Sequence, residues 1–382
     1  MLKKRPTPES KPPKSWLISI LLLAVTYTMA QPNSGMDMLP KPVCLDGKTV
    51  YINRHGDVVL KTSFDYFLLH PNSFSEGLAA FKQDGKFGYI DQTGKIVISP
   101  SYDWVDEFSD GFAEIEVNDK RGFIDRTGKV VVPVIYDKVW GYSNGYALVG
   151  VADGADKEGL YKYKWGFVDK SGQIVVGKTH NPRVGAFDDV DYFSEGLAPV
   201  KLRGKWGYVD ENGKFVLKPT FREAKSFSEG LAPATIDGKK WGFIDHTGNF
   251  VIKPQFTAAE PFSENLAPVS VYMHGWGDWG FIDHSGSFVI KPTFYRANRF
   301  QNGYSIVFYG SEGFGYLDRT GKVINKRPAG GAGNYHDGVA WIHPNDYGEN
   351  YVLYGGAYID ENGNYIWNAK EKNKAFGLNC NN

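Results

Sequence analysis

A single pattern, aromatic-Gly-aromatic-aliphatic-Asp-x-x-Gly, recurs along most of this 382-residue chain. Its clearest copy runs from Trp206 to Gly213, and the closing glycine returns at intervals of 34 to 44 residues. The closing glycines are Gly56, Gly94, Gly128, Gly172, Gly213, Gly248, Gly286, Gly321 and Gly363. A period of this size is typical of proteins assembled from repeated units that bury their apolar faces against one another, so about nine units are expected.

Two further motifs keep the same phase. The segment FSEGLAPV begins at Phe193, and related segments begin at Phe74, Phe108, Tyr142, Phe227, Phe262, Phe300 and Tyr335. The stretch KFVLKPTF, from Lys214 to Phe221, lies between the first two motifs and recurs at residues 249–256 and 287–294. Because all three stretches recur in register, the whole unit is repeated.

Alternation within the first motif predicts a β-hairpin. Trp206, Tyr208 and Asp210 fall on one face of an extended strand, and Phe215 and Leu217 share a face on the next. Asp can bond to turn amides and Gly accepts a positive φ, so Asp-x-x-Gly suits the link. We interpret the Asp column as turn chemistry and not as a ladder of cation ligands. The column comprises Asp91, Asp125, Asp169, Asp210, Asp245, Asp283, Asp318 and Asp360.

The aromatic-Gly pair is also interpreted as structural. Glycine in mid-strand weakens a sheet unless another group approaches closely, so we expect the aromatic ring of one unit to pack over the glycine of the next. A row of sugar-stacking platforms is the alternative. The residues assigned to the structural repeat are Trp165, Trp206, Trp241, Trp279, Gly166, Gly207, Gly242, Gly280, Asp169, Asp210, Asp245 and Asp283.

The rest of the unit predicts a corner, a bend and a third strand. Pro219, Pro254 and Pro292 are expected to end the second strand, because proline lacks the N–H that a sheet ladder needs. The Phe-Ser-Glu-Gly segment predicts a short helical or irregular bend with its glycine in a left-handed conformation. Asn265, the one replacement, tolerates that conformation well. The Leu-Ala-Pro-Val segment predicts the third strand.

These features predict an all-β tandem array of about nine three-stranded units. An open, solenoid-like stack is favoured, because a spacing near 35 residues is short for the four-stranded blade of a propeller. The degenerate first and last units also suit caps on exposed edges. A closed β-propeller-like ring is the alternative. A disulfide between the two cysteines, Cys44 and Cys380, would require the chain ends to meet and would support the ring.

The N-terminus has the features of an export signal. Five basic residues precede an uncharged run from Trp16 to Tyr27. This run is too short for a membrane span of roughly 20 residues but suits a secretory signal. Thr28 and Ala30 are small, which places cleavage after Ala30, with an uncleaved membrane anchor as the alternative. The expected division is a signal peptide at 1–30, a linker at 31–44, the repeat array at 45–367 and a tail at 368–382, in a periplasmic or extracellular protein.

Composition and motifs exclude several classes of function. Lys plus Arg and Asp plus Glu both number 43, so no basic field exists to hold a nucleic acid. The chain lacks the metalloprotease, P-loop, dinucleotide-binding and nucleophile-elbow motifs. His246 and His284 occupy the same position in neighbouring turns, which favours exposed turn residues over a metal pair. No metal, cofactor or catalytic residue is therefore expected.

The units differ mainly in the loop that precedes the aromatic-Gly strand. This loop has four residues from Leu202 to Lys205 but expands at residues 150–164, 272–278 and 343–355. Equivalent loops of a repeat array emerge on one side, so these three predict an aromatic binding edge. Tolerated drift in loops is the alternative. The candidate ligand-binding residues are Tyr161, Tyr163, Tyr272, Trp276, Tyr347, Tyr351 and Tyr354.

The full pattern, WG-Y/F-I/V-D-x-x-G-K-x-V-I-x-P-x-F followed by F-S-E-G-L-A-P-V, resembles the bacterial WG-repeat, or KWG-repeat, family over residues 45–367. Phe87, Arg121 and Phe314 stand where other units have the tryptophan. The resemblance implies a repeated β-rich module with an interaction role, often exported, and it does not imply an enzyme. We expect an exported scaffold that binds a protein or an envelope or extracellular polysaccharide. A cell-envelope enzyme acting on glycan or peptide is the alternative.

Overall fold

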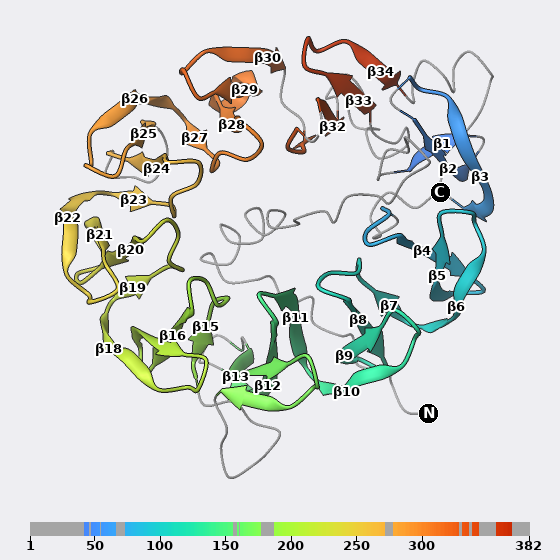
Figure 1. Cartoon of the computed structure of the whole chain (residues 1–382), viewed down its shortest axis with the longest axis horizontal. Coiled ribbons are helices and arrows are strands. Elements are labelled where there is room, and N and C mark those ends of the chain that lie inside the picture. The colour runs from blue at the N-terminus through green and yellow to red at the C-terminus, as the bar shows by residue number, and fades with distance from the viewer. Residues whose placement is uncertain are drawn as a thin grey trace.

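The repeats form a closed ring of antiparallel β-sheets in the computed structural model (Figure 1). The structure describes residues 42–45, 47–53, 55–65, 73–155, 159, 161–176, 187–271, 278–327, 331–335, 338–343 and 357–368. Within these residues there are nine sheets, and strands that follow one another in sequence are neighbours in each sheet. The prediction of an all-β tandem repeat is confirmed.

Each complete sheet has four strands, here named inner, second, third and outer by their place in the ring (Figure 1). The inner strands are β7 (Trp104–Val105), β11 (Lys138–Ser143), β15 (Asp189–Val190), β19 (Glu223–Ala224), β23 (Ala258–Ala259), β27 (Arg296–Ala297) and β31 (Gly331–Ala332). The second strands are β1 (Val43–Leu45), β4 (Leu78–Gln83), β8 (Phe112–Val117), β12 (Tyr146–Ala155), β16 (Leu197–Leu202), β20 (Ala232–Thr235), β24 (Ala267–Ser270), β28 (Tyr304–Phe308) and β32 (Val339–His343).

The remaining strands complete the sheets outward. The third strands are β2 (Lys48–Ile52), β5 (Lys86–Asp91), β9 (Lys120–Asp125), β13 (Tyr161–Asp169), β17 (Lys205–Asp210), β21 (Trp241–Ile244), β25 (Trp279–Ile282), β29 (Phe314–Asp318) and β33 (Ala357–Asp360). The outer strands are β3 (Val58–Asp65), β6 (Ile96–Tyr102), β10 (Val130–Tyr136), β14 (Ile174–Val176), β18 (Phe215–Phe221), β22 (Phe250–Phe256), β26 (Phe288–Phe294), β30 (Val323–Arg327) and β34 (Tyr365–Asn368). A 3₁₀ helix, η1 (Gly310–Glu312), precedes β29. In the described part of the chain, no helix has the length and apolar character needed to cross a membrane.

The first and last sheets pack directly against each other, and this contact closes the ring (Figure 1). Val43 of the first sheet and Val339 and Tyr358 of the last belong to one buried cluster. A Cβ added at Gly56 would lie 2.8 Å from the carbonyl oxygen of Ile366. The prediction of an open stack was therefore wrong, and the alternative of a closed ring is correct. The irregular first and last repeats do not cap exposed edges, because they meet each other.

The prediction of three strands per unit was also wrong, because the inner strand adds a fourth. In the sheet β19–β22, for example, β19 pairs with β20 through Glu223↔Thr235 and Ala224↔Ala234. This two-residue strand follows almost directly after β18, the outer strand of the preceding sheet. Such short strands and connections allow a spacing near 35 residues to accommodate four strands.

The prolines lie within the outer strands, whereas the sequence predicted that they end a strand at a corner. Pro219 lies in β18, where pairing with β17 shifts register between Trp206 and Val209. Its missing N–H is tolerated there, because an outer strand has a neighbour on one side only. The bulge, the proline and the exposed Lys218 beside it also discourage pairing with another chain along this open edge.

Gly207, Gly242 and Gly280, which follow three of the repeat tryptophans, face the outer strand of their own sheet and not, as predicted, an aromatic ring of another unit. A Cβ at Gly207 would lie 2.5 Å from the carbonyl oxygen of Leu217 and 2.7 Å from the nitrogen of Pro219. The register shift in β18 lies beside this glycine, so a side chain at this position has no room. The tryptophans pack in the core: Trp165, Trp241 and Trp279 are buried and Trp206 is half-buried.

The Phe-Ser-Glu-Gly segment forms a tight hairpin turn, which corrects the predicted helical or irregular bend. Ser228 and Leu231 exchange backbone hydrogen bonds across the turn. The two residues between them, Glu229 and Gly230, have φ values of 56° and 83°. Positive φ at both central residues is the signature of a type I′ turn. The predicted left-handed conformation is confirmed at Gly230 and also at Asn265, whose φ is 67°.

These turns link each sheet to the next around the ring. The carboxylate of Glu195 accepts a hydrogen bond from the backbone N–H of Gly230 at 3.1 Å. The hydroxyl of Ser228 donates to the carbonyl oxygen of Phe262 at 2.7 Å. Both bonds connect consecutive repeats, so the Ser-Glu-Gly motif stabilises the ring as well as the turn.

The Asp-x-x-Gly turns have the hydrogen bonds that a turn role requires. The Asp245 carboxylate accepts the backbone N–H of Thr247 at 2.9 Å and its hydroxyl at 2.6 Å, and the hydroxyl bond holds the pKa of Asp245 below its usual value. His246, in the same turn, stacks on Phe227 with ring centroids 4.2 Å apart and lies 3.1 Å from Glu195. His246 therefore takes part in the contact between sheets.

Candidate functional site on three neighbouring sheets

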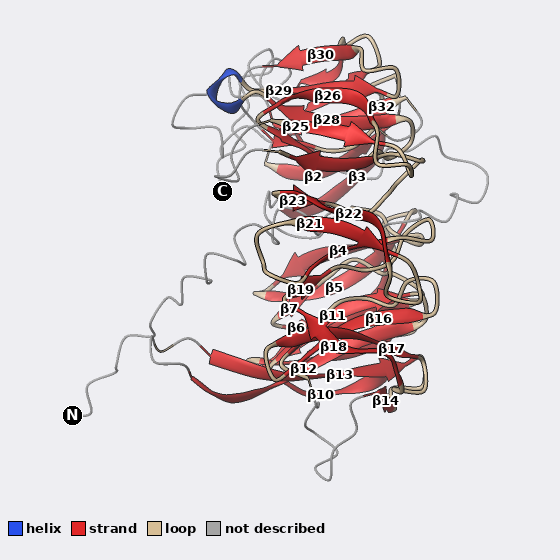
Figure 2. Ribbon diagram, turned by 90° about the vertical axis from the view of Figure 1, so that its left-hand side faces the viewer, coloured by secondary structure: helices blue, strands red, loops and turns tan. Residues whose placement is uncertain are grey.

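The hairpin of β12 and β13 projects past the neighbouring hairpins on one face of the ring (Figure 2). Its strands have ten and nine residues and pair from Tyr146↔Asp169 to Ala155↔Tyr161. The side chain of Tyr161, at the start of β13, is 66% exposed. Tyr163 is two residues further along the strand, so it lies on the same side of the sheet, where it is half-buried.

From Tyr163, aromatic rings continue to the inner strands of two sheets. Ring centroids are 6.0 Å apart for Tyr163 and Trp165 and 5.8 Å apart for Trp165 and Trp140. Trp140 lies in the inner strand β11, and Tyr192 follows the inner strand β15. Their ring centroids are 6.3 Å apart. Trp165 is buried, whereas Trp140 and Tyr192 are half-buried. We call Tyr161, Tyr163, Trp140 and Tyr192 the aromatic row.

The preceding sheet, β7–β10, contains a buried ion-pair cluster. Arg121 in β9 lies 2.5 Å from Glu114 and 2.7 Å from Glu116, both in β8. The Arg121 guanidinium also lies over the ring of Trp104 in β7, 5.2 Å from its centroid. The side chain of Glu114 is only 7% exposed. A carboxylate this deeply buried is tolerated when a charged partner bonds to it, and Arg121 is that partner.

Burial raises the pKa of the acids in this cluster. Burial raises the pKa of Glu114 from its ordinary 4.5 to about 7, although the nearby Arg121 opposes the shift. Burial also raises the pKa of Asp106, which follows the inner strand β7. Carboxyl groups with pKa values shifted toward neutrality are enriched at functional sites, although ion-pair networks with a structural role shift them as well.

A second group of acids with raised pKa values lies beside Tyr192. Burial raises the pKa of Asp189, in β15, to about 6, and it raises the pKa of Asp191 as well. The pKa of Tyr192 is raised by burial and further by the charges of Asp191, Glu114 and Asp106. Tyr192 is therefore within electrostatic reach of acids from two sheets, and the aromatic row ends in an acidic environment.

The raised pKa of Glu114 predicts that stability depends on pH. The pKa of Glu114 is about 7 in the folded protein, above the ordinary 4.5. Between pH 4.5 and pH 7 the folded protein therefore binds more protons than the unfolded chain, so the free energy of unfolding falls as pH rises through this range. Glutamine cannot ionise, so a Glu114→Gln variant should escape this fall. Its free energy of unfolding, measured relative to that of the wild type, should increase by on the order of 2 kcal/mol when the pH is raised from 4.5 to 8. Urea denaturation at both pH values measures the gain. The exposed Glu223→Gln change is the control, and an equal response of both variants would contradict the assignment.

The structure places two of the predicted ligand-binding residues, Tyr161 and Tyr163, on the projecting hairpin. The other five, Tyr272, Trp276, Tyr347, Tyr351 and Tyr354, lie outside the described residues, so their place on this face stays a prediction. The backbone of Cys44 lies in β1, but Cys380 lies outside the described residues, and the pairing of the two cysteines also stays a prediction.

The ion-pair cluster was not predicted from the sequence, although a signal for it was present. Arg121 takes the place of tryptophan in the repeat, and Glu114 stands where Pro199 occurs in the sheet β15–β18. Both changes fall in strands, whereas the units were expected to differ mainly in one loop. A charged residue at a position that is apolar in the other units would have identified this sheet as the exception.

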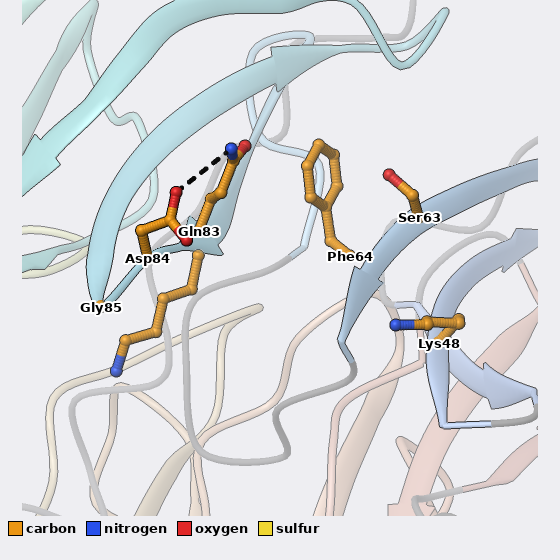
Figure 3. A pocket seen from close by; sticks show the side chains of 7 residues that line it. Lys48, Ser63, Phe64, Gln83, Asp84 and Gly85 are labelled. Carbon is orange, nitrogen blue, oxygen red and sulfur yellow. Dashed lines mark hydrogen bonds between the residues drawn. The ribbon is translucent and has the colours of Figure 1, made fainter.

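A separate pocket of about 440 Å³ lies between β2 and β3 and the tip of the β4–β5 hairpin (Figure 3). It is lined by Lys48, Ser63, Phe64, Lys82, Gln83, Asp84 and Gly85. Gln83 donates a hydrogen bond to Asp84 at 3.5 Å, and Phe64 packs against Phe81 with centroids 4.3 Å apart. A single aromatic ring and one acid make it a poorer candidate than the aromatic row. Nowhere in the described ranges do three His, Cys, Asp or Glu side chains gather as metal ligands.

Fold and site together define a closed ring of repeated β-sheets in which one hairpin projects and one sheet has buried charges. The chain belongs to the WG containing repeat family, whose model matches residues 51–87, 87–120, 122–153, 185–206, 206–239, 241–272 and 279–311. These matches cover more than half of the chain, so the resemblance seen in the sequence is confirmed.

Several solved structures are weakly similar to this chain. They include the crystal structure of the eukaryotic initiation factor, with 11% identity and a TM-score of 0.44 over 75% of this chain and 94% of that one. BamB from Moraxella catarrhalis has 12% identity and a TM-score of 0.37 over 81% and 96%. The WD40 beta propeller domain of Doa1 has 12% identity and a TM-score of 0.30 over 72% and 90%. Similarities this low do not bear on what the chain binds. No curated protein sequence matches the chain.

Proposed function

We propose that this protein is an exported, non-enzymatic binding ring that holds a polysaccharide or protein partner against the aromatic row. The observation that carries the proposal is the projecting β12–β13 hairpin, with Tyr161 66% exposed at its end. Half-buried rings such as Tyr163 and Tyr192 offer an apolar face that a sugar ring or an apolar side chain can cover. Because β-strands and neighbouring rings hold these side chains, little conformational entropy is lost on binding.

Binding is favoured over catalysis by the state of the buried acids. Glu114, whose pKa burial raises to about 7, is held by Arg121 at 2.5 Å and is only 7% exposed. A general acid must reach the atom that it protonates, and Glu114 is engaged inside the sheet. This arrangement supports a role for Glu114 in the structure of the ring.

The proposal is tested with a Tyr161→Ala and Tyr163→Ala double variant. Co-sedimentation with insoluble cellulose, chitin or peptidoglycan should show binding by the wild type and about tenfold weaker binding by the double variant, because two stacking contacts are lost. Tyr295→Ala is the matched control, since Tyr295 is also exposed, at 40%, but belongs to another sector of the ring. Equal binding by the wild type and both variants would refute the role of the aromatic row. If the wild type binds none of the three materials, the polysaccharide partner would be refuted.

An envelope enzyme acting on glycan or peptide is the second candidate, and the pKa of Glu114 near 7 is the observation that favours it. Release of reducing sugar ends or of new amino groups from peptidoglycan would then require Glu114 and would be lost in Glu114→Gln. Export is tested separately by mass analysis of the secreted protein, which should begin after Ala30.

A further inference from the structure

Three consecutive outer strands present the same exposed row of side chains. These strands are β18, β22 and β26, with the sequences FVLKPTF, FVIKPQF and FVIKPTF. They contain no acidic residue. Each exposes a valine followed two residues later by a lysine. The lysines are Lys218, Lys253 and Lys291, and the valines are Val216, Val251 and Val289, which are 47%, 55% and 52% exposed.

The amino groups of these three lysines form no hydrogen bond or ion pair within the described residues, in contrast to three lysines in the third strands of other sheets. Lys86 bonds to Asp103 and Lys120 bonds to Asp137. Lys164 bonds to Asp188 in the same way. Lys86 and Lys120 each begin a third strand, and Lys164 lies within one. In all three cases the aspartate lies in the link between an outer strand and the next inner strand.

The links that follow β18, β22 and β26 lack this aspartate. Arg222, Thr257 and Tyr295 take its place. Lys240 directly precedes β21. Its amino group donates a hydrogen bond to the neutral backbone carbonyl oxygen of Gln255 at 3.1 Å and not to an acid. The same sector of the ring therefore combines unpaired lysines on its outer strands with the loss of the acids that neutralise lysine in other sheets. The positive charge on these three outer strands, which hold three lysines and no acid, does not involve the aromatic row.

We infer that the outer surface of β18, β22 and β26, which we call the lysine belt, binds a linear polysaccharide that carries carboxylate groups. Charge complementarity identifies the occupant, because each of the three outer strands offers a lysine and contains no acid. Its repeated form suits a polymer, since a chain with a charge on every sugar can contact consecutive sheets at once and gain affinity from several weak contacts. The exposed valines beside the lysines can pack against the apolar faces of the sugar rings.

Protection of open sheet edges is the competing explanation for lysine at these positions, since exposed lysine discourages pairing between edges. It does not account for the missing aspartates, because edge protection places no demand on the links between strands. The two explanations also differ in what they predict for removal of the charges. Edge protection predicts aggregation, and the lysine belt predicts loss of ligand binding.

The test uses polygalacturonate, a linear polymer of carboxylated sugars, and the variant Lys218→Gln, Lys253→Gln, Lys291→Gln. Calorimetry at low salt should show that the wild type binds, that added NaCl weakens binding, and that the triple variant binds about tenfold more weakly. The matched control is Lys95→Gln, Lys129→Gln, Lys322→Gln. It removes the same charge from three exposed turn lysines on other sheets and should bind like the wild type.

Three outcomes would overturn the inference. They are no binding of polygalacturonate by the wild type, equal weakening in the two triple variants, and aggregation of the belt variant without any binding by the wild type. Acetylation footprinting of the unmodified protein gives an independent readout that does not depend on the variants folding. Polygalacturonate should protect Lys218, Lys253 and Lys291 from acetylation and leave Lys95 and Lys129 reactive. Failure of the aromatic-row variants on neutral polysaccharides would leave these results unaffected.

Discussion

In an Arg121→Leu variant, the free energy of unfolding at pH 8 should fall by about 3–5 kcal/mol. Arg121 is the partner of both Glu114 and Glu116, at 2.5 and 2.7 Å. Without it, Glu114 keeps a charge at 7% exposure with no cation beside it. At pH 5 the loss should be smaller, because the raised pKa of Glu114 lets the folded protein keep that carboxyl protonated. Urea denaturation followed by tryptophan fluorescence measures both values.

Lys86→Leu is the matched control for this prediction. Lys86 and Asp103 are also 2.5 Å apart, but their side chains are 45% and 37% exposed. Loss of this exposed pair should cost far less than loss of the buried one, because water screens it. The double variant Arg121→Leu, Glu114→Gln should recover part of the loss, since it leaves no charge at position 114. If Arg121→Leu and Lys86→Leu cost the same, burial would not determine the energetics of this cluster.

The repeats could be predicted from the sequence because strand alternation and turn chemistry are local. Each Asp-x-x-Gly turn depends on one carboxylate and one glycine with positive φ, such as Asp245 and Gly248, whose φ is 85°. The inner strands could not be predicted, because two residues such as Glu223 and Ala224 carry no periodicity. The inner strand β19 exists because it pairs with β20. The sequence of β18, which precedes it, does not indicate this pairing.

Ring closure was beyond the reach of the sequence pattern for a different reason. Every unit contacts its neighbours in an open stack and in a ring, so the repeat predicts the same local contacts for both. Closure depends on contacts between the two least regular repeats, which share the buried cluster of Val43 and Val339 and bring Gly56 close to Ile366. Their departures from the repeat were interpreted as signs of a cap, whereas they occur where the ends of the array meet.

The candidate site was predicted in part. The insertion before Trp165 indicated the position of Tyr161 and Tyr163, because insertions in repeat proteins tend to share one face. The sequence predicted a long loop there, whereas most of the insertion lengthens the paired strands β12 and β13. Trp140 and Tyr192 were missed, since they join the row through contacts between sheets. Such contacts follow from the packing of two repeats and not from the sequence of either one.

A Gly207→Ala variant should lose about 3 kcal/mol or more of its free energy of unfolding. Its Cβ would lie 2.5 Å from the carbonyl oxygen of Leu217, 2.7 Å from the nitrogen of Pro219 and 2.9 Å from the carbonyl carbon of Lys218. All three atoms are backbone, so relief requires β18 to separate from β17 or to give up its register shift. Thermal and urea denaturation measure the loss, and the variant should also lose pairing at the outer edge, seen as faster amide hydrogen exchange in β18.

Gly141→Ala separates this steric effect from the general consequence of replacing a strand glycine. Gly141 lies in β11, outside the positive-φ region, with no atom within 4 Å of the added Cβ. Alanine there should leave stability within about 1 kcal/mol of wild type or raise it slightly, because it restricts the unfolded chain. A large loss in both variants would mean that sheet glycines are needed for backbone freedom. A loss confined to Gly207→Ala would show that the outer-strand bulge requires glycine in the repeat, and that Pro219 and Gly207 depend on each other.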